Sequence, residues 1–324
     1  MSNAFFSMQA PAWLPCRVRN AWDNARVARA IQTVDATPVG VARPQESARA
    51  EVQMLLCRRD LRLAVLALKS LLEHTDLGLS VSVTDDGSLR EADRRFFDAQ
   101  IRNARWLDRV SRDPAVERAL EGRPHLSALY SGDFSFARRL VHPFALARSP
   151  RVIQLDADTL FLTQPAAFHA WLDGKGPRHL FLRDIRDERA DVPIEARRAI
   201  ADLWPTVVGP SVRLSVPSYF FNAGLLAFHP AELDLDVAER FLSTRETLPE
   251  SLRRGPAGIW FGDWTREQMC FLLMFAATGD ALALDDSYRI GFHPDATFCH
   301  FLRSNLGKPV VLRCVADHLA ARAA

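Results

Sequence analysis

Short apolar runs alternate with helical segments in the first part of the domain. The pattern predicts strands at residues 52–57, 79–84 and 104–110. Between them, residues 61–74 carry apolar side chains at helical spacing, and a second helix is predicted over residues 91–102. Strands that alternate with helices in this way indicate a mostly parallel sheet with helices on both faces.

The alternation continues less regularly towards the C-terminus. Further strands are predicted at residues 152–155, 179–182 and 219–228, and further helices at residues 135–146, 193–203, 237–247 and 265–278. The segment at 219–228 is either a pair of strands or one strand that bends at Asn222 to Gly224, because a glycine inside a strand pattern indicates an interruption. Residues 184–217 are polar and contain several prolines, so we expect an insertion near the site. Residues 249–262 hold two prolines and three glycines, which predicts a loop.

The N-terminal residues differ in composition from the rest of the chain. A helix is predicted at residues 17–31, and residues 37–49 are poor in apolar side chains and contain two prolines, which is typical of a linker. We therefore expect residues 1–50 to form an extension outside the central sheet, and residues 51–324 to form one α/β domain.

Composition sets limits on partners and location. The 324 residues are 48% hydrophobic and 25% charged, with a net charge of +2, which gives no argument for binding nucleic acid. The five cysteines are scattered and form no Cys-x-x-Cys pair, which favours a reducing, cytoplasmic location. No apolar run reaches the roughly 18 residues of a membrane span.

Two aspartates directly follow the apolar strand at residues 152–155. Asp156 and Asp158 are two apart, so in an extended chain both side chains point to the same side. The carboxyl ends of strands are where open α/β sheets bind ligands. Two carboxylates at that edge suit a hard divalent ion such as Mg²⁺ or Mn²⁺, which can also hold phosphates. The alternative is a turn in which the aspartates cap backbone amides.

Four segments in one order carry a resemblance to a known enzyme family. They are Arg139-Leu140, 17 residues before Asp156; Asp156-Ala157-Asp158; Phe221-Asn222-Ala223-Gly224; and His300-Phe301 with Gly307-Lys308-Pro309 downstream. Together they resemble the nucleotide-sugar glycosyltransferases of the GT-A fold, and most of all the retaining enzymes of family 8. The resemblance covers residues 51–315 and implies a GT-A-like, mostly parallel sheet flanked by helices, with residues 1–50 as an N-terminal helical extension.

The resemblance implies roles for individual residues. The metal ligands for Mn²⁺ or Mg²⁺ would be Asp156, Asp158 and His300, although a histidine beside apolar residues is also typical of a core. The residues that bind the donor nucleotide-sugar would be Asp85, Asp86, Arg139, Asn222, Gly224 and Lys308. Glu267-Gln268 stands where the family has Asp-Gln, which makes both residues, with the two aspartates, the predicted catalytic group. The alternative for Glu267 is a carboxylate near the N-terminus of a helix, where the helix dipole favours negative charge.

Some of these features have a second interpretation. Asp85-Asp86-Gly87 is also typical of a plain turn. The same segment looks like the nucleotide-binding turn of inverting family 2 enzymes, so inversion stays the alternative to retention. Trp260, Phe261 and Trp264 either stack on an acceptor sugar or pack in the core.

The predicted function is that of a metal-dependent, hexosyltransferase-like glycosyltransferase. It would move a sugar from a UDP-sugar to an unidentified saccharide, lipid-linked or protein acceptor, with peripheral membrane association compatible with the sequence. One alternative is a haloacid dehalogenase-type phosphatase, but Leu160 stands where that class needs Thr or Val. The other is a non-catalytic protein that binds sugar nucleotides.

Overall fold

The computed structural model describes most of the domain and little of the two ends. The described residues are 29, 31–107, 113–184, 194–209, 221–253, 262, 265–291, 293, 295–301, 315, 318 and 321. Several predictions fall outside them: most of the helix at 17–31, the end of the strand at 104–110, the aromatic residues Trp260, Phe261 and Trp264, and the segment Gly307-Lys308-Pro309.

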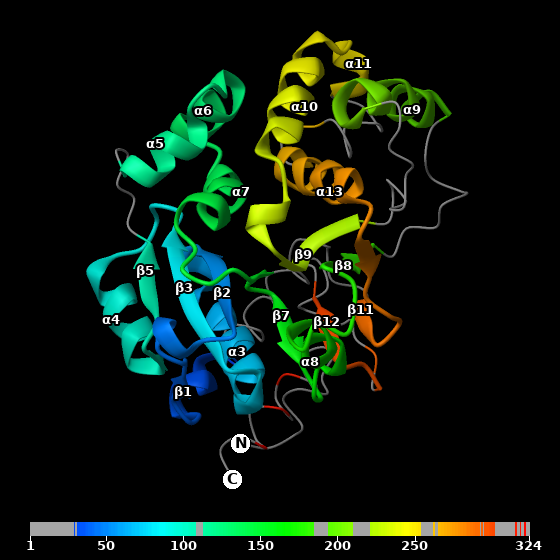
Figure 1. The fold of residues 1–324 in the computed structure, drawn as a ribbon. Helices are drawn as coiled ribbons and strands as arrows, with labels where there is room; N and C mark the ends of the chain where they lie inside the picture. The colour runs from blue at the N-terminus through cyan, green and yellow to red at the C-terminus, as the bar shows by residue number, and fades with distance from the viewer. Residues whose placement is uncertain are drawn as a thin grey trace, which may run out of the picture.

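A seven-stranded sheet forms the centre of the molecule, in the order β10-β8-β9-β6-β2-β3-β5 (Figure 1). Its strands are β2 (Ala50–Leu56), β3 (Leu79–Asp85), β5 (Arg105–Leu107), β6 (Val152–Leu155), β8 (His179–Arg183), β9 (Phe221–Phe228) and β10 (Ala281–Ala283). All neighbouring strands are parallel except β9, which is antiparallel to both β6 and β8. The mostly parallel sheet expected from the sequence is therefore confirmed.

Helices cover both faces of this sheet. They are α3 (Leu61–Leu72), α4 (Glu91–Gln100), α5 (Pro114–Leu120), α6 (Pro124–Ser131), α7 (Phe136–Ala145), α8 (Ala166–Leu172), α9 (Ile194–Val208), α10 (Leu235–Thr247), α11 (Glu250–Arg253) and α13 (Arg266–Thr278). The pattern in the sequence did not predict α5, α6 or α8, and α11 forms at the start of the segment predicted as a loop. Among the described residues, no helix combines the length and the apolar character needed to cross a bilayer.

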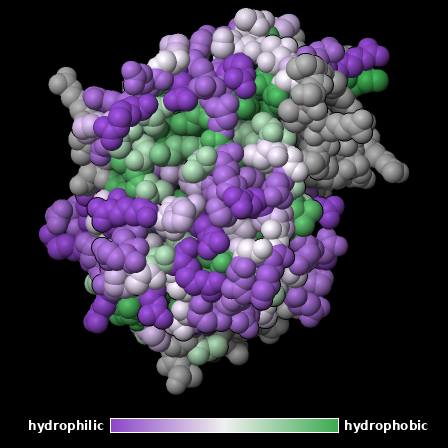
Figure 2. All heavy atoms as spheres, viewed as in Figure 1, coloured by the Kyte–Doolittle hydropathy of each residue, from purple (hydrophilic) through white to green (hydrophobic). Residues whose placement is uncertain are grey.

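Alternate residues of the strands enter two separate cores. Ile153 and Leu155 of β6 pack with α3 and α8, whereas Val152 packs with α7, α10 and α13. This alternation follows from the two-residue repeat of a strand. In Figure 2, hydrophilic residues cover most of the visible face, and apolar residues reach the surface chiefly in the upper half, where Figure 1 shows α6, α7 and α13.

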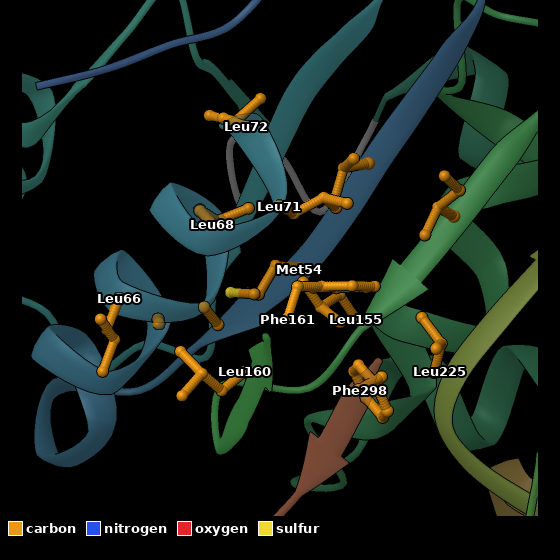
Figure 3. Packing of buried hydrophobic residues seen from close by; sticks show 14 of the residues in the cluster. Met54, Leu66, Leu68, Leu71, Leu72, Leu155, Leu160, Phe161, Leu225 and Phe298 are labelled. Carbon is orange, nitrogen blue, oxygen red and sulfur yellow. The ribbon is translucent and has the colours of Figure 1, made fainter. Parts of the chain in front are cut away.

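A smaller sheet lies beside the carboxyl end of β6. Its order is β11-β12-β7, with β7 (Thr159–Phe161), β11 (Tyr288–Ile290) and β12 (Phe298–His300). Phe161 and Phe298 are opposite each other, and their ring centroids are 4.9 Å apart. Figure 3 shows both rings in the core that also contains Met54 and Leu155. The apolar run after the two aspartates thus belongs to a second sheet.

Residues 37–49, predicted as a linker, are packed against the domain. The turn η1 (Gln32–Ala36) buries Val34, and β1 (Gly40–Val41) pairs with β4 (Ile101–Arg102) in a separate two-stranded sheet. The ammonium group of Lys69, which is fully buried on α3, donates to Thr37 Oγ1 at 2.9 Å and to the carbonyls of Val34 and Thr37 at 3.3 Å. The division of the chain at residue 50 stays a prediction.

Lys69→Ala should therefore destabilise the protein. The substitution leaves several buried oxygens without their donor and removes the packing of the aliphatic stem, which should lower the unfolding free energy by about 2–4 kcal/mol. Urea denaturation measures this change. Lys175→Ala is the control, because the Lys175 side chain is 74% exposed. Equal stability of the two variants would contradict the structural role of Lys69.

Candidate active site

A tight turn between β6 and β7 carries the two aspartates. The Thr159 hydroxyl donates to the Asp156 carbonyl at 2.8 Å, and the Asp156 amide donates to the Gly224 carbonyl at 2.9 Å. The side chains of Asp156 and Asp158 are 28% and 23% exposed, so both carboxylates remain accessible. These two bonds hold the turn through its backbone, and both carboxylates line the cleft.

His300 reaches this turn because β12 pairs with β7. The antiparallel register places His300 opposite Thr159, and the Phe301 amide donates to the Asp158 carbonyl at 2.8 Å. His300 Nε2 lies 3.2 Å from Asp158 Oδ1 and 3.6 Å from Asp156 Oδ2. One potential ligand atom from each of the three side chains lies within 4.8 Å of the others.

The three side chains suit a divalent ion. Two carboxylate oxygens and an imidazole nitrogen are ligands that Mn²⁺ and related ions accept. Burial alone would lower the pKa of His300, but its hydrogen bond to Asp158 and the charges of Asp158 and Asp156 raise that pKa above its ordinary value. Without a metal, the two carboxylates therefore favour a proton on the ring, and a cation would compete with that proton.

The His300 ring packs against Gly224 on β9, in the space that a side chain at residue 224 would occupy. A Cβ atom at residue 224 would lie 2.4 Å from His300 Cε1 and 2.5 Å from His300 Nδ1. It would also lie 2.8 Å from Asn222 Oδ1, which accepts from the Gly224 amide at 2.8 Å. His300 is 3% exposed, so the ring has little room to retreat. Only glycine leaves the ring in contact with the β9 backbone.

The predicted bend in β9 is confirmed by its register. Phe181 of β8 pairs with Leu226, but the next residue, Leu182, pairs with Asn222, so the intervening residues of β9 bulge out of the ladder. The Gln268 side chain closes this bulge: its Nε2 donates to the Phe221 carbonyl at 2.9 Å, and its Oε1 accepts from the Ala223 amide at 3.4 Å. Gln268 therefore holds the backbone that carries Asn222 and Gly224.

Arg139 connects the aspartates to α13. Its Nη1 lies 3.0 Å from Asp156 Oδ1 and 3.5 Å from Glu267 Oε1, and its Nη2 donates to the Ala223 carbonyl. The Arg139 side chain is 5% exposed, so it acts as a buried cation that orients Asp156. It also lines the cleft, where the sequence predicted a contact with the donor.

Glu267 is a buried carboxyl at the floor of the cleft. Within the described residues, its Oε1 has no hydrogen-bond partner. Burial raises the pKa of Glu267 from 4.5 to about 7, because the loss of solvation outweighs the opposing effect of Arg139. The group therefore holds a proton for part of the time near neutral pH.

The adjacent residues Asp85 and Asp86 have different surroundings, and only Asp86 lines the cleft. Asp85 Oδ1 accepts from the amides of Gly87 at 2.7 Å and Leu89 at 3.2 Å, and its Oδ2 lies 3.3 Å from Arg94 Nη2. This is the plain turn that the sequence analysis gave as the alternative. Asp86 caps the Ser88 amide at 2.8 Å and also lines the cleft.

These side chains surround a cleft of about 400 Å³. It brings together Asp86, Arg139, Asp156, Asp158, Asn222, Gly224, Glu267, Gln268 and His300, all of which the sequence predicted. The sequence analysis missed Cys57, Arg59 and Phe136 in its wall. Arg59 comes just after β2, the neighbour of β6, so the shared edge of parallel strands could have indicated it. Lys308 lies outside the described residues, and its role stays a prediction.

Gly224→Ala should disrupt the cation site more than the fold. The added methyl group has to push the His300 ring away from Asp156 and Asp158. Mn²⁺ affinity should fall at least about tenfold, which corresponds to about 1.4 kcal/mol. Isothermal titration of the protein with Mn²⁺ measures it. In Gly176→Ala, the control, the new methyl group contacts nothing within 4 Å, so its affinity should equal that of the wild type. Unchanged Mn²⁺ affinity in Gly224→Ala would remove His300 from the site.

Glu267→Gln should change how stability depends on pH. The folded protein raises the pKa of Glu267, so its contribution to stability is present at low pH and is lost as the pH rises from 4.5 to about 7. The neutral amide should remove this loss. Unfolding free energies measured across that interval test it, with the exposed Glu91→Gln as control. A variant that loses as much stability as the wild type would contradict the assignment.

Comparisons with known proteins support the fold. No protein-family model and no curated protein matches the sequence. The WbbM bifunctional glycosyltransferase is 10% identical, with a TM-score of 0.50 over 86% of this chain and 52% of that one, so this chain spans about half of WbbM. Mouse xyloside xylosyltransferase 1 is 15% identical, with a TM-score of 0.49 over 79% of this chain and 98% of that one. The galactosyltransferase LgtC is 15% identical, with a TM-score of 0.45 over 83% and 95%. The chain has a fold similar to that of the GT-A glycosyltransferases.

Proposed function

We propose that the chain is a metal-dependent glycosyltransferase whose donor is a nucleoside diphosphate sugar, with a UDP-sugar as the first candidate. We further propose that the transfer retains the configuration of the sugar. The observation that carries this proposal is the convergence of Asp156, Asp158 and His300 in one cleft. This cleft lies at the carboxyl end of β6, in a fold similar to that of WbbM. Ligands of open α/β sheets bind at that edge.

The side chains of the cleft match the charge of such a donor. When bound, a divalent ion supplies positive charge for the diphosphate leaving group. Asp156, Asp158 and His300 would hold the ion, and Arg139 keeps the Asp156 carboxylate in place at 3.0 Å. Arg59, whose side chain is 64% exposed in the cleft wall, adds a cation that can approach phosphate oxygens.

Glu267 and Gln268 would act on the sugar side of the cleft. A carboxyl with a pKa of about 7 can donate a hydrogen bond to a sugar hydroxyl when protonated, or accept one when ionised. Gln268 is bound to the backbone of β9, so it positions Asn222 and Gly224 more than it contacts a ligand. We keep Glu267 as the proposed catalytic carboxyl and treat Gln268 as a positioning residue.

Asp158→Asn tests the function directly. The substitution preserves shape but removes the charge that a cation needs, so Mn²⁺-dependent binding of UDP should fall by at least about tenfold, or 1.4 kcal/mol. Isothermal titration with UDP, with and without Mn²⁺, measures this on the intact chain. Asp202→Asn, an exposed position on α9, should bind as the wild type does.

Three results would overturn the proposal. UDP affinity that is independent of Mn²⁺ in the wild type would exclude a metal-dependent donor site. Metal-dependent UDP binding without donor hydrolysis or transfer would instead establish the non-catalytic sugar-nucleotide-binding alternative. Hydrolysis of a simple phosphomonoester without affinity for UDP would favour the phosphatase alternative.

A further inference from the structure

Phe136 is an exposed aromatic side chain in the wall of a polar cleft. It is the first residue of α7 and is 41% exposed. It precedes Arg139 by three residues, so the two side chains lie on neighbouring parts of one helix face. Five large hydrophobic side chains are exposed in the described part of the chain, and Phe136 is the one among them that lines the cleft. An exposed ring in the wall of a cleft can contact a ligand that binds there.

A second hollow contains Phe134, whose ring contacts that of Phe136. It has a volume of about 400 Å³ and is lined by Ala128, Leu129, Gly132, Asp133, Phe134 and Arg266. The Phe134 ring centroid is 5.7 Å from that of Phe136, and the guanidinium of Arg266 lies 4.6 Å from the centre of the Phe134 ring. The cleft contains one ring of this pair and the hollow contains the other. Glu267 of the cleft directly follows Arg266, so the two spaces are also adjacent along α13.

The chemistry of this wall is that of a carbohydrate subsite. A pyranose has an apolar face of C–H groups and a rim of hydroxyls. An aromatic ring packs against the C–H face. Carboxylates accept hydrogen bonds from the hydroxyls, and guanidinium groups donate hydrogen bonds to them. Phe136 and Phe134 offer the rings, and Asp133 and Arg266 offer an acceptor and donors at the edge of the hollow.

We propose that Phe136, Phe134, Asp133 and Arg266 form the acceptor subsite and that the acceptor is a neutral saccharide. This rests on the proposed glycosyltransferase function, because an acceptor has to lie beside the sugar that leaves the diphosphate. A lipid chain is a poorer match, because Asp133 and Arg266 place opposite charges in the same small hollow. Such groups lose solvation against a hydrocarbon chain, whereas hydroxyls replace the lost water.

Saturation-transfer NMR on the full chain with UDP and Mg²⁺, which is diamagnetic and does not broaden ligand signals as Mn²⁺ does, tests this subsite. The probes are maltose, cellobiose and a short-chain phospholipid, dihexanoylphosphatidylcholine. At least one disaccharide should receive saturation, most strongly at the protons of its apolar face. Phe136→Ala should weaken that binding at least about fivefold, a free-energy difference of about 1 kcal/mol. Phe136→Trp should preserve it, because the larger ring keeps the platform.

The controls separate the acceptor from the donor. Leu282→Ala removes an exposed apolar side chain of β10, which is not among the residues of either space, and should bind the disaccharide as the wild type does. Asp133 lines the hollow and not the cleft, so Asp133→Ala should weaken disaccharide binding while its Mn²⁺-dependent UDP affinity stays within about twofold of the wild type, or about 0.4 kcal/mol. Thermal melting checks that each variant is folded.

Several results would overturn the subsite. They are no disaccharide binding to the wild type, equal binding in Phe136→Ala, binding of the phospholipid alone, or, in Asp133→Ala, a fall in UDP affinity parallel to that of the disaccharide. Failure of the donor proposal is a different result, because it appears as a wild-type protein whose UDP affinity does not depend on Mn²⁺. The two measurements on one preparation therefore distinguish the two failures.

Discussion

The pairing of β7 with β12 is the constraint on which the site depends. It places His300, 142 residues away from Asp158 along the chain, against the turn that carries the two aspartates. The core beneath holds this pairing, since Phe161 and Phe298 are opposite partners with almost no exposed surface. Burying two such side chains contributes on the order of several kcal/mol. The energy that fixes the polar ligands thus comes from apolar residues two to five positions away along the chain.

Charge balance is the second constraint, and it explains why these side chains are coupled. Asp156 and Asp158 project into a partly closed cleft with Glu267 at its floor. The buried cation Arg139 lies between Asp156 and Glu267, and His300 faces Asp156 and Asp158. Where water is scarce, the negative charges of these carboxylates have to be balanced by positive charges of the protein or by a bound cation. Arg139 is permanently charged, whereas the proton on His300 can be exchanged for a metal, so the site has one fixed and one replaceable positive charge.

The sequence predicts what depends on short-range patterns and not what depends on pairing across the chain. The strand before Asp156, the helix that carries Arg139 and the bend in β9 follow from periodicity and glycine, and all three are present. The antiparallel direction of β9 and its place between β6 and β8 do not follow, because a fully buried strand has the same pattern in either direction. The sequence also did not predict that the segment at 37–49 packs on the domain. Its composition is typical of a solvated linker, but the buried Lys69 donates hydrogen bonds to Thr37 at the start of the segment. The family resemblance predicted Asp85 as a residue that binds the donor. In the structure its carboxylate accepts hydrogen bonds from the amides of Gly87 and Leu89, an arrangement that the sequence alone does not distinguish from a ligand contact.

The two sides of the cleft are built in different ways, which bears on how such a site can diversify. On the metal side, the backbone of β9 contacts four predicted residues. Its carbonyls accept hydrogen bonds from the Asp156 amide and from the side chains of Arg139 and Gln268. The fourth residue, His300, packs where a side chain at Gly224 would lie. A change at any of these four contacts shifts a backbone that the other three share. On the helical side, Phe136 lines the cleft from the start of α7, and Asp133 lines the neighbouring hollow from the loop before it. Both side chains are exposed. Substitutions there alter the surface a ligand meets and leave the shared backbone in place. A substitution in the helical wall would therefore change the surface that meets a ligand and leave the charged groups at the strand edge in place.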